Sequence, residues 1–250
     1  VSNPAARELT YPQLYDAYVE QMDALVEGGV DAILIETVFD TLNAKVAIDA
    51  AMAVMTQRNI ELPIMVSATV SDLAGRTLSG QTLEAFLASI SSYPIFSVGL
   101  NCSFGADQMI GFLRQLARRA PYYISAYPNA GLPNSMGLYD ETPESMAPKI
   151  GAMIDEGLVN IIGGCCGTDE HFIAEYLPLV AGKTPHRPVE ASPYMQLSGL
   201  ELLEVTPEVH FVNVGERCNV AGSRKFLRLI KEKQYDEAVA VARKQVEDGA

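Results

Sequence analysis

Three cysteines follow short apolar runs that are typical of β-strands. Cys165 and Cys166 are adjacent and lie between glycines in the motif Gly163–Thr168, which comes directly after Val159–Ile162, while Cys102 follows Val98–Asn101. Thiolates are common zinc ligands, and three protein ligands leave the fourth position of a tetrahedral ion open to a substrate. The pattern therefore predicts a zinc site that could bind one further ligand.

The chemistry predicted for this site is the activation of a thiol. Three thiolates overcompensate the charge of Zn²⁺, so a bound substrate thiol loses its proton and yet keeps high electron density on sulfur. Zinc sites that activate water are usually built from histidine or carboxylate, and the three histidines, His171, His186 and His210, form no ligand pattern. The alternative is that Cys102 and Cys165 are ordinary buried residues, because free cysteine is among the most buried residue types.

Composition and charge exclude several classes of protein. The chain has 250 residues, of which 48% are hydrophobic, and a net charge of −13. It can bury a core, and its charge argues against nucleic acid and against an anionic membrane surface as partners. No apolar run approaches the roughly 20 residues of a membrane helix. The four cysteines are too few for a secreted disulfide framework, so we expect reduced thiols and a cytoplasmic protein.

Strand-like runs alternate with helical segments over most of the chain. We expect strands near 31–37, 63–70, 96–102, 122–127 and 159–163, each followed by a helix. Apolar strands that alternate with helices imply a parallel sheet with helical cover. Polar or reactive residues end every predicted strand, as in a TIM barrel, whereas a doubly wound fold gathers them at one crevice. We therefore predict an α/β fold containing the last five β/α units of an incomplete (β/α)8 barrel.

Two further strand-end residues could bind a substrate or the metal. Glu36 could hold a substrate ammonium group, although a solvated or ion-paired carboxylate is an equal alternative. Asn129 could offer its amide oxygen to the open zinc position or orient a ligand, but asparagine is also common in turns. Cys218 is remote in sequence from the other cysteines, and we expect it to be an unligated thiol.

The regular alternation ends near Gly182. We predict that 1–181 belong to the barrel, that the proline-punctuated stretch 182–208 is an interdomain linker, and that 209–250 open a second domain with a first strand at His210–Gly215. Because the chain starts at Val1 and stops at a helix-to-strand transition, we expect an internal piece of a longer polypeptide. Unpaired sheet edges would leave that piece poorly stable or inactive alone.

Several segments resemble one enzyme family. The segments Asp31–Thr41, Gly99–Cys102, Pro128–Asn134 and Gly163–Thr168 look like the homocysteine-binding barrel of cobalamin-dependent methionine synthases, and Leu197–Glu201 and Phe211–Asn219 resemble the passage into their methyltetrahydrofolate-binding barrel. The cysteine motifs alone indicate only the wider family of zinc-dependent homocysteine S-methyltransferases. The segments Leu197–Glu201 and Phe211–Asn219 narrow the resemblance to the cobalamin-dependent methionine synthases. The resemblance covers nearly the whole chain.

The resemblance implies a role for each matching residue. The zinc ligands would be Cys102, Cys165 and Cys166. The amino-acid part of L-homocysteine would lie near Glu36, which binds its ammonium group, and near Thr37, Ser67, Ala68 and Thr69. Asn129 would lie close to the metal. Glu216, Arg217 and Asn219 would contribute to the pterin site of a second α/β barrel.

The implied reaction is methyl transfer from methylcobalamin to the thiol of L-homocysteine, which gives methionine. Methyltetrahydrofolate on the second barrel would recharge the cobalamin. The chain has no Asp-x-His-x-x-Gly cobalamin motif, so we expect cobalamin on a module outside it. Two alternatives are a homocysteine S-methyltransferase that uses betaine or S-methylmethionine, and a non-catalytic zinc-binding barrel.

Overall fold

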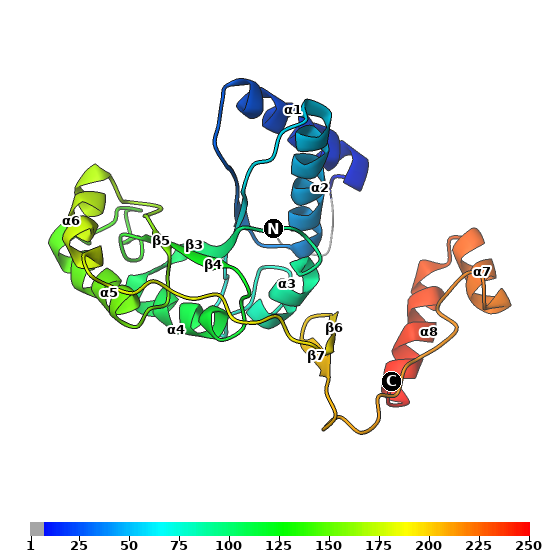
Figure 1. Cartoon of the computed structure of the whole chain (residues 1–250). Helices are drawn as coiled ribbons and strands as arrows, with labels where there is room; N and C mark the ends of the chain where they lie inside the picture. Colours follow the sequence, from blue (N-terminus) through cyan, green and yellow to red (C-terminus); the bar gives the residue numbers. More distant parts are fainter. Residues whose placement is uncertain (1–7) are drawn as a thin grey trace. The chain divides into compact units, whose positions relative to one another are not determined.

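Five parallel strands form the main sheet. They are β1 (Ile33–Val38), β2 (Ile64–Ala68), β3 (Ser97–Gly105), β4 (Tyr123–Asn129) and β5 (Ile161–Ile162), and they pair in sequence order (Figure 1). A doubly wound sheet reverses its strand order at a switch point, whereas a barrel does not. The sequential order in this computed structural model, which describes residues 8–250, confirms the predicted α/β fold of the incomplete barrel type.

Helices alternate with these strands. They are α1 (Tyr11–Glu27), α2 (Thr41–Arg58), α3 (Leu83–Ile90), α4 (Ala106–Ala117), α5 (Pro143–Asp155) and α6 (Glu170–Val180). Local sequence signals fix several starts: Asp40 caps α2 by accepting from two backbone N–H groups, and Thr142 opens the capping box of α5. Asp169 caps α6 by accepting from His171 N, and the hydroxyl of the preceding Thr168 donates to the carbonyl of Cys165.

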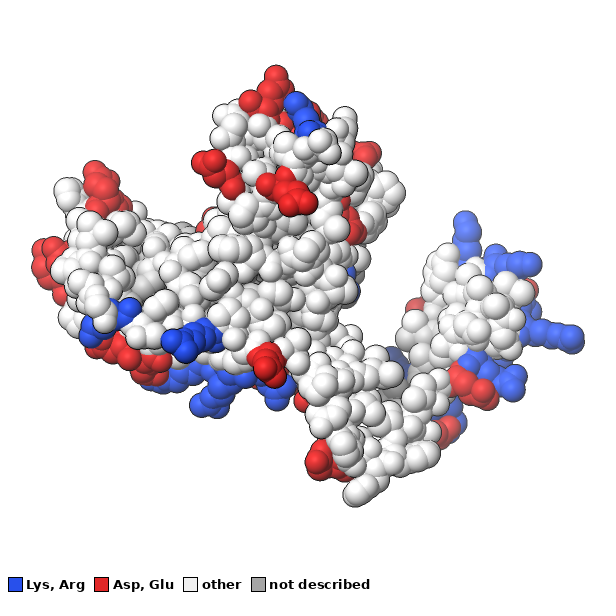
Figure 2. All heavy atoms as spheres, in the orientation of Figure 1, with Lys and Arg blue, Asp and Glu red and all other residues white. Residues whose placement is uncertain are grey.

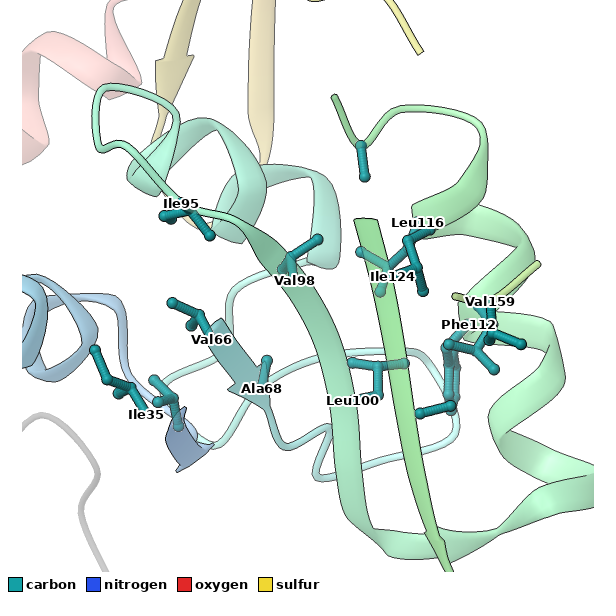
Figure 3. Close-up of a cluster of buried hydrophobic side chains, with 14 of the residues drawn as sticks. Ile35, Val66, Ala68, Ile95, Val98, Leu100, Phe112, Leu116, Ile124 and Val159 are labelled. Atoms are coloured by element: carbon teal, nitrogen blue, oxygen red, sulfur yellow. The ribbon is translucent and has the colours of Figure 1, made fainter. Parts of the chain in front are cut away.

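One face of the sheet is buried by the helices. The register places Ile35, Val66, Val98 and Ile124 side by side on four successive strands, and all four are at most 4% exposed. Figure 3 shows this row together with Phe112 and Leu116 of α4, which packs against β3 and β4. This packing fixes the strands relative to one another and so holds their carboxyl ends at one edge.

The strand bounds differ from expectation at β3 and β5. β3 continues past Cys102 to Gly105, whereas β5 contains only Ile161–Ile162 of the expected run 159–163. Among the described residues β5 pairs only with β4, through Ser125–Ile161 and Ala126–Ile162, and the chain beyond it enters the loop that carries Cys165 and Cys166.

The stretch 182–208 is more ordered than an irregular linker. Its first part lies against the sheet, since His186 N donates to Val159 O (3.1 Å) and Val189 N donates to Ala120 O (3.2 Å). Its second part forms a hairpin of β6 (Met195–Ser198) and β7 (Leu202–Val205). Over 183–192, before the hairpin, the backbone has no regular secondary structure.

The chain divides into two compact units between Leu203 and Glu204. In the second unit α7 (Arg224–Lys231) packs on α8 (Tyr235–Glu247), burying Leu229 and Ala238. The strand expected at 210–215 is absent from the described structure. A lone extended segment has no neighbour to satisfy its backbone groups, so it forms no ladder.

Charged side chains lie in separate groups on the face drawn in Figure 2. Basic side chains gather over the region of α4 and also over α7 and α8, while acidic side chains are scattered over the rest of the face. Within residues 8–250 no helix has both the length and the apolar character needed to cross a membrane.

Candidate metal centre

Cys102 lies where β3 departs from regular pairing. The ladder between β3 and β4 is regular up to Asn101 and shifts register before Gly105. Cys102 and Ser103 both have a left-handed backbone, with φ of 63° and 60°. For residues other than glycine this conformation costs roughly 1–3 kcal/mol and persists only where the surrounding structure imposes it, often at functional sites. The strand end is therefore shaped around the Cys102 thiol.

The loop that carries Cys165 and Cys166 is fixed to the end of β4. Cys165 N donates to Pro128 O (2.9 Å), Cys166 N donates to Asn129 Oδ1 (3.0 Å), and Ala130 N donates to Cys166 O (2.9 Å). Asn129 is 2% exposed, and its amide oxygen positions the backbone of Cys166. Both thiols are thus held by β4 although they follow β5.

The three thiols meet at this edge of the sheet. The Sγ atoms of Cys102, Cys165 and Cys166 all lie within 4.8 Å of one another, and those of Cys102 and Cys166 are 3.7 Å apart. All are free thiols. Tetrahedral zinc with Zn–S bonds of about 2.3 Å spaces its sulfurs about 3.8 Å apart. The donor set and its spacing therefore fit a zinc ion.

The thiols differ in acidity. Burial raises the pKa of Cys165 to about 11, and the nearby Cys102 adds to the rise. Burial also acts against ionisation of Cys166, but hydrogen bonds from Cys102 and Tyr139 outweigh it and hold the pKa of Cys166 below its usual value. Closely spaced thiolates repel one another, so this cluster favours a cation among its sulfurs.

Two glycines make room for the cysteine loop. A Cβ at Gly164 would lie 2.2 Å from Thr168 Oγ1, whose hydroxyl closes the loop by donating to Cys165 O (2.7 Å). Gly167 has φ of 81°, and a Cβ there would lie 2.6 Å from Cβ of Tyr139. The glycines that flank the vicinal cysteines are thus required by close packing.

Asn101 joins the cysteines to the expected substrate-binding residues. It is 1% exposed, and its Oδ1 accepts from Ser67 Oγ (2.8 Å) and Thr37 N (3.1 Å). Its Nδ2 donates to Thr37 Oγ1 (2.9 Å) and to Cys165 Sγ (3.9 Å). Thr37 has φ of 60°, so this side chain holds a strained strand end beside the thiols.

The other expected substrate-binding residues lie at the same ends of β1 and β2. Glu36 is exposed, whereas Ala68 and Thr69 are buried. Burial raises the pKa of Tyr127 on β4, and the charge of Glu36 adds to the rise. The structure thus brings the expected cysteines, Glu36, Thr37, Asn129 and the Ser67–Thr69 run to one edge.

Sequence reasoning missed two residues as members of this site. Asn101 precedes Cys102 in the strand-end motif, and that position was the available signal. Tyr139 lies in a loop that is held by the side chain of Asn134, whose Oδ1 accepts from Met136 N (2.9 Å) and Leu138 N (3.0 Å). Nothing in the local sequence connects that loop with Cys166.

The residues expected at a pterin site belong to the second unit. Glu216 and Arg217 line a pocket of about 710 Å³ together with residues of α8, and Arg217 Nε donates to Glu216 Oε1 (3.0 Å). Asn219 packs against Gly222. The Cys218 Sγ accepts from Gln245 Nε2 (3.0 Å).

The fold and the site define a barrel-type α/β protein with a cluster of three thiols that could hold a metal ion, and comparison with known proteins identifies the family. The model of the family described as homocysteine S-methyltransferase matches residues 2–177. The chain therefore belongs to the homocysteine S-methyltransferase family, a family of methyltransferases.

Two solved structures share the fold. They are the apo and metallated forms of the homocysteine methyltransferase MmuM from Escherichia coli, with TM-scores of 0.51 and 0.50 and identities of 21% and 22%. The matches cover 69% and 68% of this chain, but only 58% and 52% of the MmuM chains. This chain thus spans less than two thirds of their length, and identities this low show the fold alone.

Proposed function

We propose that this chain supplies the zinc- and homocysteine-binding part of a methyltransferase, with Cys102, Cys165 and Cys166 as zinc ligands. The observation that carries the proposal is the approach of three thiols, from two distant strand ends, to within 4.8 Å of one another. Membership of the family supports L-homocysteine as the substrate. Reduced thiols of this kind suit a cytoplasmic protein.

The chain's own residues would bind and orient the substrate. The side chain of Glu36 is exposed and can form an ion pair with the ammonium group of the substrate. Asn101 fixes Thr37 beside it, and Asn129 fixes Cys166. When bound, zinc would lower the pKa of the substrate thiol so that a nucleophilic thiolate exists near neutral pH. Holding that sulfur in line with the methyl carbon would reduce the entropic part of the barrier.

For the methyl donor we propose methylcobalamin, held on a module outside this chain. The support is the resemblance of 211–219 to the opening of a methyltetrahydrofolate-binding barrel, in which Glu216, Arg217 and Asn219 would contact the pterin. The product would be methionine. Activity of the complete protein that requires cobalamin supports this donor, whereas turnover with betaine or S-methylmethionine and no cobalamin contradicts it.

The metal ligands can be tested by zinc content. The Cys165→Ala variant should lose most of the zinc that the unsubstituted protein retains after mild chelation, because two thiolates remain where three are needed. Metal analysis after gel filtration measures the stoichiometry, expected to be about one per chain. Cys218→Ser is the matched control and should retain zinc; full retention by Cys165→Ala would contradict the ligand assignment.

Substrate binding to the metal separates an enzyme site from a structural one. On addition of homocysteine, zinc-edge X-ray absorption should gain one sulfur neighbour, with release of about one proton, because the thiol binds as a thiolate. An unchanged first shell would favour the non-catalytic barrel instead.

A further inference from the structure

The β6–β7 hairpin is hydrogen-bonded to the segment that follows β2. Among the bonds that join them, Thr82 N donates to Leu200 O (2.9 Å), Gln81 Nε2 donates to Gly199 O (3.0 Å), and Ser198 Oγ donates to Ala85 O (2.6 Å). The turn of the hairpin thus meets the loop 70–82 and the start of α3. All of these residues lie in the first unit.

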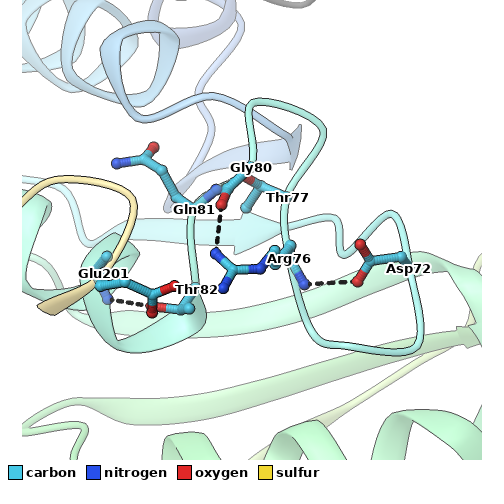
Figure 4. A network of polar contacts seen from close by, with 8 residues as sticks. Asp72, Arg76, Thr77, Gly80, Gln81, Thr82 and Glu201 are labelled. Atoms are coloured by element: carbon cyan, nitrogen blue, oxygen red, sulfur yellow. Dashed lines mark hydrogen bonds and ion pairs between the residues drawn. The ribbon is translucent and has the colours of Figure 1, made fainter. Parts of the chain in front are cut away.

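Arg76 reinforces this contact from the loop side. Its guanidinium forms an ion pair with Glu201 of the hairpin and donates through Nη1 to Gly80 O (2.8 Å), and its backbone N donates to Asp72 Oδ1 (3.1 Å). Figure 4 shows the side chain reaching across the loop toward Gly80 and Glu201. One residue therefore shapes the loop and binds the hairpin.

The same loop is also tied to the connection between β1 and α2. Thr41, the first residue of α2, donates through Oγ1 to Gln81 Oε1 (2.7 Å), and Ser79 N donates to Phe39 O (3.3 Å). Gln81 uses both ends of its amide, one toward the hairpin and one toward α2. Phe39 is only two residues beyond the strained Thr37.

We propose that the β6–β7 hairpin is a clamp that positions the candidate substrate site through Gln81. With Gly199 on one side and Thr41 on the other, Gln81 transmits the docking of the hairpin to the segment Glu36–Leu42. The inference rests on the proposed function, since that segment carries the group expected to bind the ammonium of homocysteine. Gln81, Arg76 and Glu201 are thus positioning residues.

Two variants of the complete protein test the clamp by amide hydrogen exchange. Gln81→Glu keeps an acceptor for Thr41 but cannot donate to Gly199 O, and Glu201→Gln removes the charge that pairs with Arg76. In both, peptides 36–42 and 71–82 should exchange about three- to ten-fold faster, the size expected for one lost hydrogen bond. The KM for homocysteine should rise by a similar factor, with kcat within two-fold and zinc content unchanged.

The control is Glu190→Gln, a glutamate that precedes the hairpin, is exposed and makes no side-chain hydrogen bond within the described structure. It should leave exchange and KM unchanged. Faster exchange at 71–82 with no change at 36–42, uniform loosening of the whole unit, or an unchanged KM would each overturn the clamp. The hydrogen-exchange measurement needs neither zinc nor homocysteine, so it tests the clamp by itself. If the unsubstituted protein binds no homocysteine, that result contradicts the proposed function and leaves the exchange result for the clamp standing.

Discussion

At the scale of single residues, the candidate site depends on buried amides that hold strained backbone. Asn101 satisfies the Thr37 N–H and the Ser67 hydroxyl with one oxygen, and it donates to Thr37 Oγ1 with its nitrogen. The amide oxygen of Asn129 likewise accepts from the Cys166 N–H. A buried donor left without a partner costs more than the hydrogen bond gained, so these amides specify where the reactive groups lie.

The Asn101→Leu variant tests this positioning role. Leucine has a similar volume but leaves the Thr37 and Ser67 donors unpaired, so the free energy of unfolding should fall by about 2–4 kcal/mol. Urea unfolding followed by circular dichroism measures it. Ser67→Ala removes only one donor and should cost about 1 kcal/mol or less; equal losses in the two variants would contradict the role of Asn101.

At the scale of elements, close approach of β3 to β4 is a condition for bringing the thiols together. Gly99 of β3 lies opposite Ser125 of β4. A Cβ at Gly99 would lie 2.2 Å from the Ser125 backbone oxygen and 2.0 Å from its Oγ. Backbone atoms in a ladder cannot move aside without breaking its hydrogen bonds, so the glycine is required by the packing of the two strands.

We therefore expect Gly99→Ala to destabilise the protein by about 1–3 kcal/mol or more. Gly111→Ala is the matched control: it lies within α4 with nothing within 4 Å of the added Cβ, and it should stabilise by about 0.5–1 kcal/mol. Thermal unfolding of both variants gives the comparison. An unchanged midpoint for Gly99→Ala would show that the strands separate easily.

At the scale of the whole molecule, the segment after α6 is packed as part of the first unit. His186 is 7% exposed, its backbone oxygen accepts from Asn160 Nδ2 (2.8 Å), and its Nε2 has no hydrogen-bond partner in the described structure. Burial lowers the pKa of His186. Burial thus favours the neutral form of the His186 imidazole in the folded protein.

This histidine makes stability depend on pH. Its folded pKa lies below the unfolded value of about 6.5, so on acidification the unfolded chain binds the proton first. The free energy of unfolding should therefore fall as pH drops from 7.5 to 5, by at most about 1.4 kcal/mol per pH unit for this one group. In His186→Gln the fall should be shallower, as measured by calorimetry at each pH. The exposed His171 provides the control, and a wild-type slope in His186→Gln would refute the prediction.

The sequence alone determined the alternation of elements and the positions of the candidate ligands. Apolar runs, capping residues such as Asp40 and Thr142, and proline at a helix start act on neighbours a few residues away, so their effect can be read locally. The convergence at one edge also followed, because carboxyl ends of parallel strands share an edge. The predicted strand at 210–215 was wrong, because local pattern does not supply a partner strand.

Only the tertiary structure decided which side chains hold the thiols and what packs beside them. The bonds of Asn101 to Thr37, of Asn129 to Cys166, and of the β6–β7 hairpin to Gln81 join residues far apart in sequence. Tyr139 reaches Cys166 from a separate loop. Such contacts depend on the register and packing of the whole sheet, and no local spacing encodes the partner of a buried polar group.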